Sequence, residues 1–209
     1  MAGPRLTVKS VADILLNPKS NTSTVLQDQK YPANDPQKFR TPYYQGSIAA
    51  IRQYYANAND TKTLAHWRNK LLSIKNEARR ANNIRVIDVF ATSSLAKRKL
   101  IPTTNKRYVS TINGVTISLS ADMQATQGGV LQIVYFHCRA VPLDPLVADM
   151  IANVANLVLQ GHGVIATPPQ IEVMDLCVGK SLRASTWNSA TQKSVAARAQ
   201  AISQLWTQI

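Results

Sequence analysis

The sequence has few of the residues on which catalysis and metal binding depend. Its 209 residues include 11 Asp and Glu, three His and two Cys. The carboxylates form no close couple on one helical face, which general acid-base catalysis would need. The histidines and cysteines lack the short spacings of a zinc site. The composition therefore argues against an enzyme and predicts no metal ion or cofactor.

Two further kinds of site are excluded by spacing. Cys138 and Cys177 lie on apolar segments and match no disulfide framework, so both are expected to be reduced thiols in the core. Gly179-Lys180-Ser181 resembles the end of a phosphate-binding loop. That pattern needs a glycine five residues before Gly179, where the chain has Met174. We therefore expect no nucleotide-binding loop.

Long hydrophobic runs are also missing. No stretch approaches the roughly 20 apolar residues that a membrane span needs. The apolar residues from Val11 to Leu16 include Asp13 and stop at Asn17-Pro18, which argues against a secretory signal. The sequence predicts a soluble or peripheral protein.

Positive charge is abundant, and it is confined to one half of the chain. Residues 1–110 contain 19 Lys and Arg against 6 Asp and Glu, whereas residues 111–209 contain five of each. The segment 62–107 alone has 12 cations and two anions. A run of charge on one helix is usually a solvated face, but this run extends over several elements. Such cations repel one another, and a bound polyanion would relieve the repulsion.

We therefore expect this segment to contact phosphates. No helix-turn-helix, zinc finger, aromatic RNP motif or GXXG loop is present, so base-specific readout is disfavoured. The candidate RNA-binding residues are Lys62, Arg68, Lys75, Arg79, Arg80, Arg85, Lys97, Arg98, Lys99, Lys106 and Arg107.

An extended arm is predicted at the N-terminus. A short helix over 8–16 is followed by a polar stretch, 17–46, that four prolines interrupt. In this stretch Lys and Arg alternate with tyrosines and Phe39, a mixture that suits single-stranded nucleic acid. Alternatively, the rings hold the arm against its own core or that of another subunit. The candidate self-association residues are Tyr43, Tyr44, Ile202 and Trp206.

The remaining pattern predicts an α+β fold. The helical N-terminal half with its arm precedes a small antiparallel sheet whose hairpin turns at Asn113-Gly114. We expect residues 1–45 to form the arm and 46–209 a single domain, with a basic helical part at 46–107 and a neutral core part at 108–209. The expected helices are 48–58, 61–82, a buried helix at 145–160 and a docked C-terminal helix at 188–208. The expected strands are 84–90, 108–112, 115–119, 130–137 and 171–178.

These features favour a structural, sequence-nonspecific RNA-binding protein that forms homo-oligomers, such as a viral coat or nucleocapsid subunit. The layout alone, and no family motif, supports that comparison. The expected location is the virion or the host cytoplasm, and Lys97-Arg98-Lys99 has the composition of a nuclear import signal. A matrix-type protein on an anionic membrane surface and an RNA-binding silencing suppressor are the alternatives.

Overall fold

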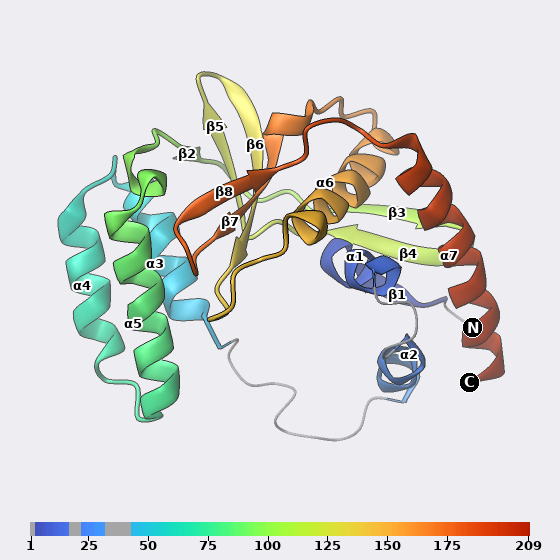
Figure 1. The fold of residues 1–209 in the computed structure, drawn as a ribbon, viewed down its shortest axis with the longest axis horizontal. Coiled ribbons are helices and arrows are strands. Elements are labelled where there is room, and N and C mark those ends of the chain that lie inside the picture. Colours follow the sequence, from blue (N-terminus) through green and yellow to red (C-terminus); the bar gives the residue numbers. More distant parts are fainter. Residues whose placement is uncertain (1–2, 17–21, 32–42) are drawn as a thin grey trace.

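The computed structural model describes residues 3–16, 22–31 and 43–209. These residues form a mixed α+β fold with two sheets (Figure 1). The helices are α1 (Val8–Leu16), α2 (Thr22–Lys30), α3 (Gln45–Ala56), α4 (Thr61–Leu71), α5 (Glu77–Thr92), α6 (Pro145–Gln160) and α7 (Ser189–Gln208), with short 3-10 helices η2 (Ser94–Lys97) and η3 (Pro168–Gln170). The strands are β1 (Arg5–Thr7), β2 (Ile101–Pro102), β3 (Tyr108–Ile112), β4 (Val115–Leu119), β5 (Met123–Gln127), β6 (Val130–His137), β7 (Ile171–Asp175) and β8 (Lys180–Arg183).

Both sheets are mixed, so the expectation of one small antiparallel sheet was too simple. The larger sheet has the order β2-β5-β6-β7-β8, and β6 runs parallel to β7. Parallel neighbours need a crossover connection, which α6 supplies. The smaller sheet has the order β1-β4-β3, in which β1 runs parallel to β4.

The larger sheet separates two hydrophobic cores. Successive side chains of a strand point to opposite faces. Ile133 and Tyr135 of β6 therefore join the core formed with α1, α6 and α7, whereas Val134 and Phe136 join the core formed with α3, α4 and α5. We call α3, α4, α5 and η2 the helical lobe. In Figure 1 it lies on one side of the sheet, and α1, α6 and α7 lie on the other.

The helical lobe differs from the prediction in two respects. The expected single helix over 61–82 is two helices, because the chain turns after Leu71 and the Asn76 side chain caps α5 by accepting from the Arg79 backbone N–H at 2.8 Å. The expected strand over 84–90 is part of α5. Its apolar residues satisfied the strand pattern, but Val86, Ile87 and Phe90 have helical spacing and pack into the helical-lobe core.

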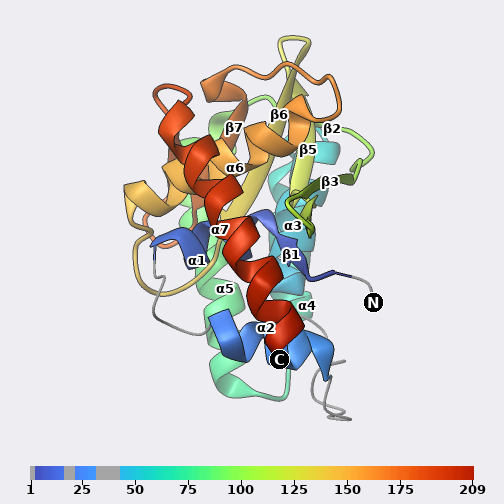
Figure 2. The same ribbon diagram turned by 90° about the vertical axis from the view of Figure 1, so that its right-hand side faces the viewer.

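The N-terminal region is more regular than predicted. The helix over 8–16 is confirmed as α1, but β1 and α2 were not expected. Figure 2 shows α2 beside the C-terminal end of α7. The Lys30 Nζ donates to the Trp206 carbonyl at 2.8 Å, and the Tyr31 hydroxyl donates to the Ile209 carbonyl at 3.1 Å. The aromatic and basic residues expected within 32–42 lie outside the described residues.

The features predicted from local signals are confirmed. The hairpin of β3 and β4 turns at Asn113 and Gly114, whose φ angles of 46° and 82° fit a type I′ turn. The Asp144 side chain caps α6, and α7 begins after Asn188. Ser118 of β4 is buried, and its hydroxyl donates to the Leu6 carbonyl of β1 at 3.3 Å.

We expect Gly114→Ala to destabilise the fold, because a φ of 82° costs an L-residue about 1–2 kcal/mol. An added Cβ would also lie 2.7 Å from the Ser203 hydroxyl oxygen of α7, which must then rotate. Gly129→Ala is a matched control, since its φ is 81° and its added Cβ meets nothing within 4 Å. Urea denaturation should show a larger loss for Gly114→Ala. Equal losses would mean that α7 does not pack closely over this turn.

Candidate nucleic-acid interface

One end of the helical lobe holds three exposed lysines. The Asn59 side-chain amide donates to the carbonyls of Ala96 and Arg98 at 2.9 and 2.8 Å, which fixes the start of α4 beside η2. Lys62 lies in the first turn of α4, and Lys97 and Lys99 lie at η2. All three side chains are exposed, and none has a carboxylate partner within the described ranges. We call Lys62, Lys97 and Lys99 the η2 cluster.

The opposite end holds a second group of cations around the start of α5. Lys75 is exposed in the turn between α4 and α5. The Arg79 Nε donates to the Tyr43 carbonyl at 3.2 Å, and the Arg80 Nη1 donates to the Ile74 carbonyl at 3.1 Å. Helices α4 and α5 run in opposite directions between these two ends of the helical lobe (Figure 1). Cations that follow one another in the sequence are therefore divided between the two ends.

Three predicted cations lie between or outside these two groups. The Arg68 Nε forms an ion pair with Asp88 at 3.0 Å, so its charge is partly neutralised. Lys106 and Arg107 are exposed in the loop between β2 and β3, outside the helical lobe. The Lys106 Nζ lies 5.1 Å from the centre of the Tyr108 ring. The predicted surface is therefore broad rather than a single line of charge.

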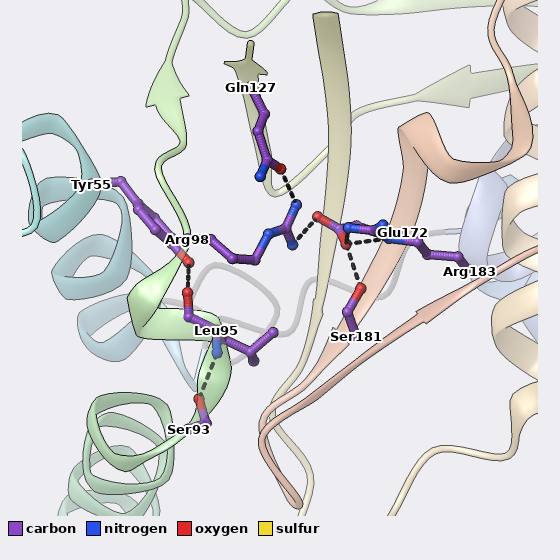
Figure 3. Close-up of polar contacts among 8 residues, drawn as sticks. All are labelled: Tyr55, Ser93, Leu95, Arg98, Gln127, Glu172, Ser181 and Arg183. Atoms are coloured by element: carbon purple, nitrogen blue, oxygen red, sulfur yellow. Dashed lines mark hydrogen bonds and ion pairs between the residues drawn. The ribbon is translucent and has the colours of Figure 1, made fainter.

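Arg98 was predicted to bind RNA, and the structure corrects that prediction. Its side chain is 14% exposed, and its Nη1 lies 2.6 Å from Oε1 of Glu172, which is completely buried. The Arg98 Nη2 also donates to the Gln127 side-chain oxygen at 2.8 Å. Arg183 and Ser181 donate to the other oxygen of Glu172 (Figure 3). A buried carboxylate requires such partners, and they leave Arg98 unavailable to phosphate.

Arg85 is a second predicted RNA-binding residue whose side chain bonds within the fold. Its guanidinium donates to the carbonyls of Cys138, Arg139 and Leu176 at 2.8, 3.2 and 3.4 Å. These bonds join α5 to the ends of β6 and β7, so Arg85 holds the helical lobe on the sheet. The Lys97-Arg98-Lys99 motif likewise presents two exposed lysines instead of three cations.

The candidate self-association residues have different environments. Ile202 is buried in the chain's own core, and Trp206 packs against that core. Tyr44 packs against the helical-lobe core, whereas Tyr43 is 41% exposed. Three of the four therefore pack into or against the chain's own cores, which leaves Tyr43 as the exposed member.

The two cysteines are free thiols, and burial changes the pKa of one of them. Burial, followed by the charge of Asp122, raises the pKa of the Cys138 thiol to about 12, so Cys138 is protonated at neutral pH. The Cys177 thiol is partly exposed and donates to the Ala140 carbonyl at 3.1 Å. Within residues 3–16, 22–31 and 43–209, no three His, Cys, Asp or Glu side chains are grouped to hold a metal ion.

The function of the protein has to be inferred from this geometry, because comparison with known proteins identified no relative. No protein-family model, curated protein or solved structure matches the chain.

The sequence analysis missed the bonds around Glu172, although a signal for them was present. A glutamate in a segment expected to be a buried strand needs hydrogen-bond donors or a cation nearby.

Proposed function

We propose that the protein binds the phosphates of RNA without reading the base sequence. It coats the RNA as a self-associating structural protein, such as a viral coat or nucleocapsid subunit. One observation carries the proposal. Six predicted cations are exposed and have no carboxylate partner in the described part of the chain: Lys62, Lys75, Lys97, Lys99, Lys106 and Arg107. Binding of phosphates to such cations releases counterions, which favours association with a polyanion.

The same cations would also be attracted to an anionic membrane, at about 1 kcal/mol for each one near the surface. No described helix is long and apolar enough to cross a membrane. The exposed cations occupy both ends of the helical lobe and a separate loop, a distribution that suits a wrapped strand better than a flat surface. We therefore treat membrane binding, and duplex binding by a silencing suppressor, as outcomes of the test.

We expect neutralising the η2 cluster to weaken RNA binding and its salt dependence. In the triple variant Lys62→Gln, Lys97→Gln, Lys99→Gln, the slope of log K against log salt should become shallower by about 2, because each lost single-strand phosphate contact removes about 0.7. Fluorescence anisotropy with a labelled oligouridylate at several salt concentrations measures this slope.

The control removes the same charge elsewhere. Arg139→Gln, Lys180→Gln, Lys193→Gln changes three exposed cations of the half that has no net charge, and its slope should match the unmodified protein. Equal changes in both triple variants would show that net charge alone matters. Tight binding to phosphatidylserine vesicles without RNA binding would replace the proposal by the membrane alternative. A small oligomer that stays unchanged on added RNA, by light scattering, would remove the coating role.

A further inference from the structure

Among the described residues, Tyr43 is the most exposed aromatic residue next to the helical-lobe cations, and it is held in place. Its backbone carbonyl accepts from the Arg79 Nε at 3.2 Å and from the Asn83 Nδ2 at 2.9 Å. Its hydroxyl accepts from the Asn82 Nδ2 at 3.0 Å. The ring is thus anchored at both ends by α5 while the residue remains 41% exposed. A ring that is already ordered loses little conformational entropy when a ligand stacks on it.

One cation lies beside this ring, and a second lies in the same stretch of chain. The Arg79 guanidinium carbon lies 5.9 Å from the centre of the Tyr43 ring. Lys75 is exposed in the turn before α5, and Glu77 is the one carboxylate of the segment from Lys75 to Asn83. The arrangement places an aromatic surface and phosphate-binding groups within one short stretch of structure. Proteins that bind single-stranded nucleic acid combine these two features, since the cations contact phosphates and the rings stack on unpaired bases.

We propose that Tyr43 is a stacking platform for an unpaired RNA base, with Arg79 and Lys75 contacting the adjacent phosphates. The proposal rests on the RNA-binding function proposed above and specifies its substrate as single-stranded. In a duplex the faces of the bases are covered by their neighbours, so an external ring has nothing on which to stack. In a single strand each stacked base contributes about 1–3 kcal/mol, whatever its identity.

Tyr43→Leu tests the platform, because it removes the ring and keeps the backbone carbonyl that Arg79 and Asn83 bind. Binding to a 12-nucleotide oligouridylate should weaken by about 5- to 150-fold, the range that corresponds to one lost stacked base. Tyr43→Phe keeps the ring and should bind within a few-fold of the unmodified protein. A 12-base-pair duplex, and an oligonucleotide of 12 abasic sites, should bind Tyr43→Leu and the unmodified protein equally.

Tyr31→Leu is the matched control, since Tyr31 is 62% exposed and follows α2, outside the basic helical lobe. It should leave oligouridylate affinity unchanged. Unchanged affinity of Tyr43→Leu for the oligouridylate, or an equal loss for the duplex, would overturn the stacking platform and leave the RNA-binding function standing. Absence of RNA binding by the unmodified protein would instead refute the proposed function itself. Circular dichroism of each variant confirms that the fold is retained.

Discussion

Glu172→Gln is expected to reduce the free energy of unfolding by about 3–5 kcal/mol, the usual cost of breaking a buried ion pair. Glu172 is fully buried, and its carboxylate compensates the charges of Arg98 and Arg183. A neutral amide leaves the largely buried Arg98 without a counter-charge. The amide NH2 group also replaces one of the two carboxylate oxygens, which accept hydrogen bonds from Arg98 on one side and from Ser181 and Arg183 on the other. Urea denaturation followed by circular dichroism measures the loss.

The matched control is Asp88→Asn, which removes a carboxylate from the ion pair with Arg68. Both of those side chains are about half exposed, so the expected loss is at most about 1 kcal/mol. The double variant Arg98→Met, Glu172→Leu should lose less than Glu172→Gln, because no unpaired buried charge remains on Arg98. If Glu172→Gln were as stable as Asp88→Asn, the buried pair would not hold η2 on the sheet.

Stability should fall steeply in alkaline solution. Burial raises the pKa of the Tyr55 and Tyr135 hydroxyls, and it raises the pKa of the Cys138 thiol to about 12. In the unfolded chain these groups lose their protons near their ordinary pKa values, about 10 for Tyr and 8.5 for Cys. Below those values both states are protonated and the stability is complete. Above them only the unfolded state releases protons, so the free energy of unfolding decreases until the folded pKa is reached.

Each such group lowers the free energy of unfolding by at most about 1.4 kcal/mol per pH unit in that window. The unfolded tyrosines are still half protonated at pH 10, so the three groups together amount to about 3 kcal/mol between pH 10 and 11. Cys138→Ala removes one group and should make the decrease about one third smaller. Cys177→Ala, at the partly exposed cysteine, is the control. Urea denaturation from pH 8 to 11 gives these slopes. A slope unchanged by Cys138→Ala would show that this thiol is not protected by burial.

Local signals were sufficient for the parts of the fold that depend on few residues. Asn113-Gly114 determines a hairpin by itself, because its two residues adopt the positive φ angles of the turn. Asp144 similarly identifies the start of α6, since its side chain binds a backbone N–H two residues later. These interactions lie within a few positions of one another, so the sequence contains all the information they need.

The segment 84–90 could not be assigned in the same way. Its apolar residues are compatible with a strand, and helix formation is decided by residues far away in the sequence. The Phe90 ring lies edge-on to the rings of Tyr54 and Tyr55, at 5.4 and 5.5 Å between centroids. Those tyrosines belong to α3, so the helical assignment depends on tertiary packing that overrides local preference.

The candidate interface was only partly predictable for a related reason. Counting charges identifies a basic segment but cannot separate exposed cations from paired ones. Arg98 is neutralised by Glu172, which is 74 positions away, and Arg85 binds carbonyls more than 50 positions away. Lys97 and Lys99, on either side of Arg98, remain exposed. The alternation of exposed and paired cations along Lys97-Arg98-Lys99 is visible only when the sheet is in place.

The docking of the N-terminal segment has a consequence for biosynthesis. Leu6 of β1 pairs with Ile117, and Lys30 at the end of α2 binds the Trp206 carbonyl, 176 positions later. A ribosome adds about 5–20 residues per second, so these partners follow by about 5–35 seconds. Until then Val8, Val11 and Ile14, which are buried in the finished fold, have no surface to cover them. These apolar residues are therefore buried only well after they have been synthesised, and the nascent chain needs protection from aggregation during that interval.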